Sequence, residues 1–477
     1  MTPWSPGSAD LHPLIARIAH RARDTPGATA LICEGSETSY GALWAQAVGV
    51  AGELLRLGAE PGDRIALDGE RLPRQFANIL GVLIGGGIYV PLGEKAPAAR
   101  RAAMTADARA RFRLSAEGAI EPLEPSSASA MAALPPGYIL YTSGSTGAPK
   151  GVWVTLDNVL AYVGNVQRHY PLAAGARAAQ MADLGFDASV HEMFGAWSAG
   201  AALCVVPTRH VLMWPRYFRD RAVETALLVP SQVRLAHRAG LLKPGSLPAL
   251  RRVYLGAELV TGEVVRLMQA AAPDCAFVNL WGPTEGTVAL THHPIDRRPA
   301  DHDGVPIGRP WADHRVTLAD EQDGIGEMIA SGPQICRGYW NLPEAEVDRF
   351  FPHDGRIFYR TGDLARRDAA GDLLFAGRRD RQIKIKGHRI ELEECERSIR
   401  RLAGTGQAVV IAQAEDLVCF IAADVAIDRL EAALRADLPA YMIPSRFVPV
   451  PDFPMTPSAK IDLGRLRLML EDPSHAP

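Results

Sequence analysis

The sequence predicts an α/β protein with a large N-terminal domain of layered, mainly parallel sheets and helices and a small α+β C-terminal domain. Short apolar runs typical of buried strands alternate with segments of helical period over roughly the first 300 residues. The chain then changes to short strands, turns and Gly-rich connections, which favours a β-barrel-like part before the small domain. The length of 477 residues also exceeds one domain, since a domain takes about 150 residues. We place the domains at residues 1–379 and 380–477.

The expected elements follow in order along the chain. Helical periodicity is clearest in residues 40–58 and 156–170. Near the C-terminus, RQIKIKGHRIEL alternates as a hairpin would, and ELEECERSIRRL continues as an amphipathic helix. The charged segment GRRDRQ, which contains Asp380, would link the two domains. The strand-like runs are RIALDG, IYVPL, YILYT, AALCVVP, TALLVP and RRVYLGAE.

Composition and charge argue against several classes of protein. With 47% apolar and 22% charged residues, the chain resembles an ordinary folded protein, and its net charge of −3 gives no reason to expect nucleic acid or a membrane as partner. The six cysteines lack metal-ligand or dense disulfide spacing, and the N-terminus lacks a signal-peptide core, so we expect a cytoplasmic protein. The uncharged stretch QFANILGVLIGGGIYVPLG contains five Gly and a Pro, which favours a helix, a turn and a strand over a membrane span.

A Gly-, Ser- and Thr-rich loop follows a strand in YILYTSGSTGAPKGVWV, residues 138–154. Such a loop presents backbone N–H groups and hydroxyls, and Lys150 adds positive charge, so phosphate is its expected ligand. It is not the usual mononucleotide loop, because Lys150 is followed by Gly151 rather than by Ser or Thr. The alternative is a flexible surface turn.

Seven segments in a fixed order resemble the amino-acid adenylation domains of nonribosomal peptide synthesis, in the adenylate-forming superfamily. The resemblance implies a large N-terminal domain and a small mobile C-terminal domain that together use ATP to activate a carboxylate. Asp380 matches the hinge about which the small domain swings. The matching segments are YVPLGEKAPAAR, YTSGSTGAPKG, FDASVHEMFGAW, NLWGPTEGTV, FYRTGDLARR, GRRDRQIKIKGHRIELEECE and SAKIDLGRL.

The chemistry explains why the family needs these residue types. A substrate carboxylate is already ionised, so the protein must align it with the α-phosphorus and neutralise the charge of the transition state. The resemblance implies that Glu285 binds Mg²⁺, although an exposed Glu in a turn is the alternative. The loop residues Thr142, Ser143, Gly144, Ser145, Thr146, Gly147 and Lys150 would share the pyrophosphate charge with Mg²⁺.

The same resemblance assigns the rest of the nucleotide site. Trp281, with Gly282 and Thr284, stands where the family has Tyr against the adenine; a core aromatic is the alternative. Asp363 would bind both ribose hydroxyls with help from Arg378, unless it only caps a turn. Lys460 resembles the lysine that bridges the substrate carboxylate and the phosphate. Ala459 replaces the usual Gly beside it.

FDASVHEMFGAW predicts a helix with Asp187 at its N-terminal end and His191 on one face with Phe194. By resemblance Asp187 pairs with the α-ammonium group of an amino acid; an N-cap is the alternative. The mostly aliphatic lining favours a neutral, medium-sized, leucine-like substrate. A noncanonical side chain is also expected as an option, because His191 could donate a hydrogen bond to it. The remaining pocket positions are Ala188, His191, Leu227, Tyr254, Gly256, Leu280, Val288 and Ala289.

The 477 residues contain no Gly-Gly-His/Asp-Ser site of a carrier domain, so we expect a freestanding enzyme. The aminoacyl group would pass to the phosphopantetheine thiol of a separate carrier protein, and a small activator protein could be needed. A coenzyme A ligase for acyl or aryl acids is one alternative. A catalytically silent nucleotide-binding scaffold is the other.

Overall fold

The computed structural model describes residues 11–123, 134–144, 149–296, 300–301, 304–341, 349–405, 407–413, 415–421, 426–450, 453–455 and 461–471. The chain forms two compact units. The first unit consists of Met1–Glu94, Met104–Tyr141 and Gly151–Arg379. The second unit consists of Lys95–Ala103, Thr142–Lys150 and Asp380–Pro477. The predicted role of Asp380 as a hinge stays a prediction.

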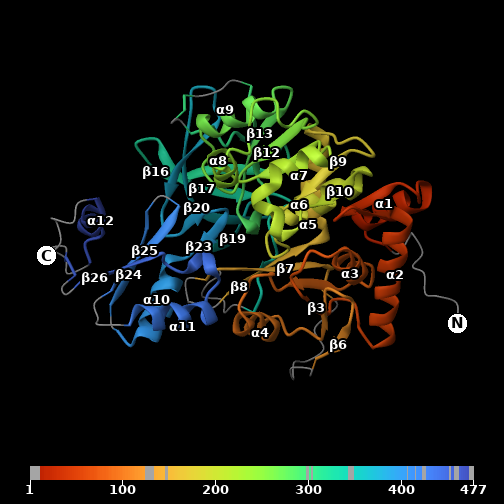
Figure 1. The fold of residues 1–477 in the computed structure, drawn as a ribbon, viewed down its shortest axis with the longest axis horizontal. Helices are drawn as coiled ribbons and strands as arrows, with labels where there is room; N and C mark the ends of the chain where they lie inside the picture. Colours follow the sequence, from red (N-terminus) through yellow and green to blue (C-terminus); the bar gives the residue numbers. More distant parts are fainter. Residues whose placement is uncertain are drawn as a thin grey trace. The chain divides into compact units, whose positions relative to one another are not determined.

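A nine-stranded sheet forms one layer of the first unit (Figure 1). Its inner strands pair in parallel, and only the outer pairs that involve β2, β14 and β15 are antiparallel. The strand-like runs at residues 201–207, 225–230 and 251–258 lie in it, as predicted. In spatial order the strands are β15 (Arg309–Pro310), β14 (Thr291–Pro294), β13 (Ala276–Trp281), β12 (Arg252–Leu255), β11 (Thr225–Leu228), β9 (Arg177–Gln180), β10 (Ala202–Val205), β1 (Thr29–Cys33) and β2 (Ser36–Ser39).

A seven-stranded sheet forms a second layer, again with a parallel centre, where β5, β3, β4 and β7 pair. The uncharged stretch at residues 75–93 forms helix α3 (Pro73–Ile84), a turn and strand β4, which confirms that prediction. In spatial order the strands are β18 (Gly338–Tyr339), β8 (Lys150–Thr155), β7 (Gly137–Thr142), β4 (Ile88–Pro91), β3 (Arg64–Leu67), β5 (Phe112–Leu114) and β6 (Ile120–Pro122).

The pleat of the nine-stranded sheet divides its side chains between two cores. Leu227, Tyr254 and Val278 belong to one hydrophobic cluster, whereas their neighbours Leu228 and Val253 belong to another. The first cluster joins residues of both sheets to the helices α1 (Pro13–Asp24), α2 (Tyr40–Arg56), α3, α5 (Leu156–His169) and α6 (Ala188–Ala199). The second cluster packs the opposite face against α7 (Trp214–Asp220), which follows the 3-10 turn η1 (Thr208–Met213), and against α8 (Pro230–Arg238) and α9 (Gly262–Ala271).

Local signals fix the ends of the two helices that carry the site. Helix α5 begins with a capping box, in which Thr155 accepts from the amide of Asn158 and the Asn158 side chain accepts from Thr155. Helix α6 ends at Gly200, whose φ of 81° lies in the left-handed region that favours glycine. These signals place α5 and α6 side by side against the sheet (Figure 1).

The predicted β-barrel-like part is a five-stranded antiparallel sheet. Its core includes Trp281, Leu290 and Met328, so it packs on the end of β13. This contact brings β20 and β21 to the end of β13. The strands are β16 (Arg315–Gln322), β17 (Ile325–Ser331), β20 (Arg356–Arg367), β19 (Phe350–His353) and β21 (Leu373–Arg378).

The second unit has a small core of its own, around Cys395, Ile399 and Leu434. It contains the predicted hairpin, whose turn residues Lys386 and Gly387 both have positive φ, and the predicted amphipathic helix. Its elements are β22 (Ile383–Ile385), β23 (His388–Ile390), α10 (Leu392–Ala403), β24 (Ala408–Gln413), β25 (Asp416–Ile421), α11 (Ile427–Asp437), η4 (Ala440–Met442), β26 (Arg446–Pro449) and α12 (Leu463–Glu471).

The locally basic segment after Pro97 forms α4 (Ala98–Asp107), which buries Met104 and leaves much of its surface solvated.

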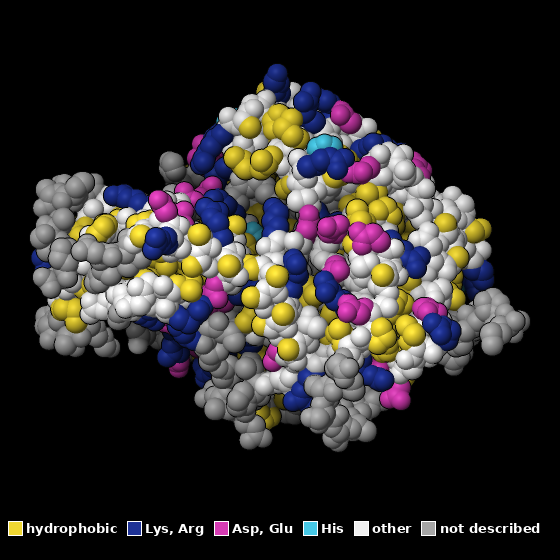
Figure 2. All heavy atoms as spheres, turned by 60° about the horizontal axis from the view of Figure 1, so that its bottom comes forward, with side chains coloured by type: hydrophobic (Ala, Val, Ile, Leu, Met, Phe, Trp, Pro, Cys, Tyr) yellow, Lys and Arg dark blue, Asp and Glu magenta, His cyan; other side chains and the backbone are white. Residues whose placement is uncertain are grey.

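Charges of both signs are interspersed on the face shown in Figure 2. Among the described residues, no helix is both long enough and apolar enough to cross a bilayer. All six cysteines are buried free thiols, in agreement with the absence of a disulfide spacing pattern in the sequence.

A buried carboxylate joins α6 to the end of β9. Glu192 is 4% exposed and accepts hydrogen bonds from the backbone amides of Met181, at 3.0 Å, and Ala182, at 3.1 Å. Burial raises the pKa of Glu192 to about 8, although the two amides and Arg71 act in the opposite direction. Folding therefore favours the protonated carboxyl group between pH 4.5, its ordinary pKa, and about pH 8.

We expect Glu192→Gln to become more stable relative to the wild type as pH rises from 5 to 8. In this pH range the carboxyl group ionises in the unfolded chain and stays protonated in the folded one, so the wild type loses up to about 1.4 kcal/mol of unfolding free energy per pH unit, whereas the amide does not titrate. Denaturant unfolding at several pH values measures the difference. The exposed Glu117→Gln should give a pH-independent difference, and a flat difference for Glu192→Gln would contradict the prediction.

Candidate active site

Three predicted nucleotide-binding residues meet at the end of β13. The indole Nε1–H of Trp281 donates to Oδ2 of Asp363 at 3.1 Å, and Arg378 donates to Oδ1 of the same carboxylate. Asp363 on β20 and Arg378 on β21 are direct cross-strand partners, so the sheet register fixes the ion pair. Asp363 is 2% exposed, and each of its oxygens keeps a second lone pair for a hydroxyl donor.

Trp281 also packs as a core aromatic, the alternative that the sequence left open. It is 6% exposed and shares a hydrophobic cluster with Leu290 and Met328. Its indole therefore positions Asp363 by a hydrogen bond, and stacking on adenine stays a prediction.

Glu285 lies in the 3-10 turn η2 (Thr284–Gly286) and is fully buried. The alternative interpretation of Glu285, as an exposed residue of a turn, is therefore wrong. The hydroxyl of Tyr339 donates to Oε1 of Glu285 at 2.8 Å, and the amide of Cys336 donates to its carbonyl oxygen at 2.8 Å. The described residues include no group of three His, Cys, Asp or Glu that could hold a metal. A single oriented carboxylate fits Mg²⁺, because that ion takes most of its ligands from phosphates and water.

The segment after Glu285 has an unusual backbone. Thr287 and Val288 have φ values of 55° and 70°, in the left-handed region, which is costly for β-branched residues at about 1–3 kcal/mol each. The buried side chain of Gln334 donates to the carbonyl oxygens of Ala289 at 2.7 Å and Gly286 at 3.2 Å. The hydroxyl of Thr287 donates back to the carbonyl oxygen of Gln334 at 2.6 Å. Gln334 thus holds the segment that carries the predicted pocket residues.

Most of the predicted pocket residues belong to or contact the large hydrophobic cluster that joins the two sheets. Two glycines allow its backbone segments to approach one another. A Cβ on Gly256 would lie 2.7 Å from the carbonyl oxygen of Leu280, and a Cβ on Gly282 would lie 2.6 Å from Cα of Ala289. The cluster contains or contacts Ala188, Leu227, Tyr254, Leu280, Val288 and Ala289.

Asp187 stands at the N-cap position of α6, and its side chain makes no capping hydrogen bond. The N-cap alternative is therefore not realised. Burial raises the pKa of Tyr162, and the charges of Tyr254 and Asp187 act in the same direction. The carbonyl oxygen of Asp187 accepts from the amide of His191 at 3.3 Å, one helical turn further on.

His191 is 8% exposed and pairs with a residue that the sequence analysis did not identify. The hydroxyl of Tyr162, on α5, lies 2.7 Å from Nδ1 of His191. The ring of Tyr254 meets the imidazole edge to face, with centroids 4.7 Å apart. Burial lowers the pKa of His191 to about 4, so the imidazole is neutral at physiological pH. His191, Leu227 and Tyr254 line a mostly apolar cavity of ≈ 30 Å³.

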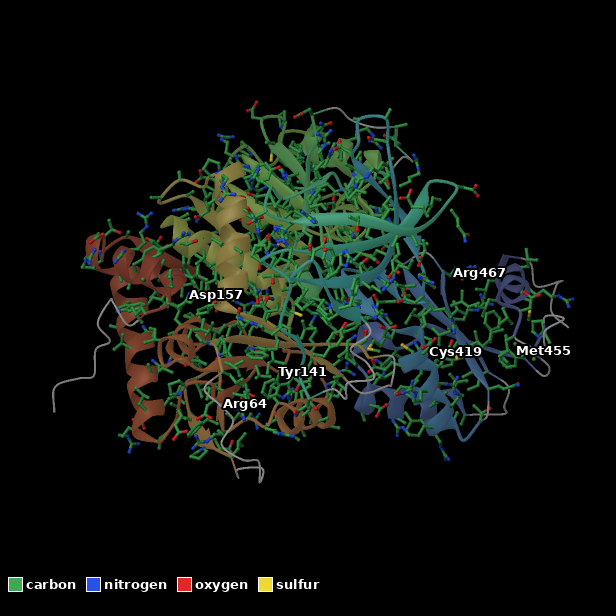
Figure 3. The ribbon with its side chains drawn as sticks, turned by 180° about the vertical axis from the view of Figure 1, so that it is seen from behind. Arg64, Tyr141, Asp157, Cys419, Met455 and Arg467 are labelled. Atoms are coloured by element: carbon green, nitrogen blue, oxygen red, sulfur yellow. The ribbon has the colours of Figure 1, made fainter. Side chains whose placement is uncertain are left out.

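The Gly/Ser/Thr loop is described up to Gly144. Tyr141, labelled in Figure 3, precedes it in β7. Its hydroxyl donates to Oδ2 of Asp107 at 2.6 Å. The hydroxyl of Thr142 donates to the carbonyl oxygen of Lys150 at 3.4 Å, and Lys150 is 8% exposed. The predicted residues Ser145, Thr146, Gly147 and Lys460 lie outside the described residues.

Within the second unit, the start of this loop contacts the N-terminal end of α10. The amide of Gly144 donates to Oε2 of Glu394 at 3.2 Å, and Oε1 of Glu394 accepts from Arg100 at 2.7 Å. The hydroxyl of Ser143 donates to the carbonyl oxygen of Arg389 at 2.9 Å and accepts from the amide of Glu391 at 3.2 Å. Glu394 is 1% exposed, and burial raises its pKa. The carboxylate of Glu394 thus accepts the hydrogen bond of the Gly144 amide, which the sequence analysis assigned to phosphate.

A family model described as "AMP-binding enzyme" matches residues 18–134 and 124–340. The chain belongs to the AMP-binding enzyme family. Curated relatives narrow this membership to the adenylation domains of nonribosomal peptide synthesis, as predicted. Phenyloxazoline synthase MbtB of Mycobacterium tuberculosis is 33% identical over 500 residues, which cover 98% of this chain and 35% of the relative. Surfactin synthase subunit 2 of Bacillus subtilis is 32% identical over 485 residues, which cover 94% of this chain and 13% of the relative.

Solved structures confirm the predicted α/β fold of this adenylation domain. The Vibrio cholerae adenylation domain AlmE, in complex with glycyl-adenosine-5'-phosphate, has a TM-score of 0.85 at 24% identity, with 99% of each chain covered. Holo-PA1221, a protein with adenylation and PCP domains, has a TM-score of 0.81 at 27% identity, with 98% of this chain and 85% of that chain covered. The chain spans about a third or less of the curated relatives named above, whose length leaves room for further domains.

The sequence analysis missed several residues that hold the site of the adenylation domain. Tyr162, Gln334 and Tyr339 act through partners 29, 45 and 54 residues away, which no local pattern reveals. Arg100 and Glu394 do lie within two of the seven matching segments, so their charges offered a signal. No signal in the sequence indicated that the two residues pair with each other across 294 residues.

We expect Gln334→Leu to lower the unfolding free energy by about 2–3 kcal/mol and to raise the KM for the amino acid. The buried carbonyl oxygens of Gly286 and Ala289 lose a donor, and each such loss costs about 1–3 kcal/mol. Denaturant unfolding and steady-state kinetics provide the measurements. The exposed Gln322→Leu is the control, and an unchanged stability for Gln334→Leu would contradict the role of Gln334.

We expect Glu394→Gln to bind ATP about fivefold more tightly than the wild type. Its carboxylate competes with phosphate for the Gly144 amide, and a charge-assisted bond is worth roughly 1 kcal/mol more than a neutral one. A fluorescent ATP analogue measures the affinity. The neighbouring exposed Glu393→Gln has the same change of charge and should have little effect. Equal or weaker binding by Glu394→Gln would show that no competition occurs.

Proposed function

We propose that this adenylation domain uses ATP to convert a neutral α-amino acid into an aminoacyl-AMP with release of pyrophosphate. One observation carries the proposal: the carboxylate of Asp187 stands at the start of α6, one turn from His191 and beside a cluster of buried apolar side chains. A carboxylate in that position suits an ammonium group, and the apolar wall suits a neutral side chain. The glycyl adenylate bound by the relative AlmE is of the same chemical class.

The reaction needs alignment rather than a protein nucleophile. The substrate carboxylate would attack the α-phosphorus, form the acyl–phosphate bond and expel pyrophosphate. In this proposal Lys460 contacts the carboxylate and the α-phosphate, and Lys150 and Thr142 contact the departing phosphates together with Ser143, Gly144, Ser145, Thr146 and Gly147. Glu285, oriented by Tyr339, would hold Mg²⁺, which supplies positive charge to the phosphates when bound.

The nucleoside would lie at the end of β13. Asp363 has free lone pairs for the ribose hydroxyls while Trp281 and Arg378 fix its orientation. Gly282 and Thr284 contribute the adjacent backbone, beside the face of Trp281 that we assign to adenine.

We further propose that the aminoacyl group passes to the phosphopantetheine thiol of a carrier protein supplied from outside residues 1–477. The relative PA1221 combines adenylation and PCP domains, which supports such an acceptor. Asp380 would be the hinge that moves Lys460 away before the thiol approaches, and a small activator protein is a further candidate partner. The substrate would carry a neutral, medium-sized side chain, either leucine-like or noncanonical.

Amino-acid-dependent ATP–pyrophosphate exchange tests the proposal. We expect exchange with one neutral amino acid, and we expect Asp187→Asn to lower kcat/KM about 100-fold or more, since loss of a buried charge partner costs about 2–5 kcal/mol. Lys460→Ala should lower kcat by a similar factor. Asp157→Asn, whose side chain is 71% exposed, is the control for Asp187.

Exchange with fatty or aryl acids alone, with coenzyme A as acceptor, would favour the alternative of a coenzyme A ligase. No exchange with any acid would favour a catalytically silent nucleotide-binding scaffold. An unchanged rate for Lys460→Ala would contradict the proposed mechanism.

A further inference from the structure

We propose that the activated amino acid carries a neutral hydrogen-bond acceptor in its side chain, and that the Tyr162–His191 pair selects it. This inference rests on the proposed function and names the substrate class of the same site. It narrows the expected side chain from leucine-like or noncanonical to one with a hydroxyl or amide oxygen.

The first step assigns the proton between the two side chains. Among the described residues, the hydroxyl of Tyr162 has one hydrogen-bond partner, Nδ1 of His191 at 2.7 Å. If Nδ1 carried the hydrogen, the O–H of the fully buried Tyr162 would have no acceptor. Burial also raises the pKa of Tyr162 well above 10, so Tyr162 keeps its proton and donates it.

The second step follows from the neutral state of the imidazole. Because Nδ1 accepts, Nε2 of His191 must carry the hydrogen. No side chain or backbone group of the described residues accepts a hydrogen bond from Nε2. Nε2 is not among the fully buried polar atoms that lack a partner in the described part of the chain, so it keeps access to the space beside α6, where a ligand can accept its hydrogen. The pocket therefore offers one N–H to whatever fills it.

The third step concerns the reach of the ligand. Asp187 and His191 lie four residues apart on one face of α6, and such side chains are about 5–6 Å apart. An ammonium group on Asp187 and an acceptor on Nε2 must therefore belong to a short molecule. Tyr254 crosses His191 edge to face, and the adjoining cavity of ≈ 30 Å³ has room for roughly two water molecules. An oxygen at the γ or δ position satisfies both limits.

The fourth step concerns charge. A neutral imidazole donates a hydrogen bond without supplying positive charge, so it does not compensate for a buried carboxylate on the ligand. Neutral oxygen acceptors fit best, as in short hydroxyl or amide side chains. Apolar isosteres of the same shape would leave Nε2 unpaired, and sites built to hydrogen-bond a substrate discriminate strongly against such analogues.

Exchange kinetics with isosteric pairs test the inference on the wild-type protein. The pairs are threonine and valine, and asparagine and leucine. We expect the acceptor-bearing member of at least one pair to exceed its apolar isostere at least tenfold in kcat/KM for ATP–pyrophosphate exchange. The ratio within a pair cancels effects on nucleotide binding.

Two variants and a matched control assign the preference to the pair. His191→Phe should bring the ratio close to one. Tyr162→Phe removes the hydroxyl that positions the imidazole. It should lower the ratio of kcat/KM values within a pair and change the melting temperature less than His191→Phe does. His12 pairs with Asp157, at 3.0 Å, and is not among the residues that line the cavity, so His12→Phe should keep the wild-type ratio.

The outcomes separate this inference from the function on which it rests. Exchange in which valine and leucine both equal or exceed their acceptor-bearing partners overturns the inference and leaves amino-acid adenylation intact. A wild-type ratio that persists in both Tyr162→Phe and His191→Phe overturns it as well. No exchange with any amino acid overturns the proposed function and this inference together.

Discussion

The parallel pairing of β9, β11, β12 and β13 is the constraint on which the rest of the site depends. Parallel strands bring their carboxyl ends to one edge of a sheet, and in open α/β sheets ligands bind beyond that edge. The register aligns Leu228 with Leu255 and Leu255 with Asn279, so the segments after these strands emerge together. Helix α6, which carries Asp187 and His191, follows β9 at the same edge.

Above that edge, the pocket depends on hydrogen bonds that offset a costly backbone. Thr287 and Val288 adopt left-handed φ values, and Gln334 satisfies the carbonyl oxygens on both sides of them. Gln334 is itself held in place. Its side-chain oxygen accepts a hydrogen bond from Asn165 at 3.1 Å, and its backbone N–H donates to Nε2 of His314 at 3.3 Å. The loop that follows β17 thus supports the segment that carries Val288 and Ala289.

The sequence was sufficient to predict the layered α/β class, the strands at residues 64–69, 88–92, 138–142, 201–207, 225–230 and 251–258, and helices α2, α5, α6 and α10, since each depends on local apolar periodicity. The gathering of the pocket residues could be predicted only through the resemblance to a family. The pairs Trp281–Asp363, Tyr162–His191 and Gln334–Ala289 could not, because each joins residues that only the folded chain brings together. Burial of Glu285 was missed for the same reason: a Gly/Pro turn looks solvated when its neighbours are unknown.

The burial of all six cysteines has a consequence for the study of this protein in solution. The thiolate is the reactive form of cysteine, and burial raises the pKa of Cys204, Cys275 and Cys419 to about 12 and those of Cys33 and Cys395 as well. The folded chain is therefore poorly reactive toward alkylating probes and mild oxidants at neutral pH. One cysteine introduced on the surface of each compact unit would carry a spectroscopic label selectively, without removal of the native thiols, so the distance between the two labels can be followed during turnover.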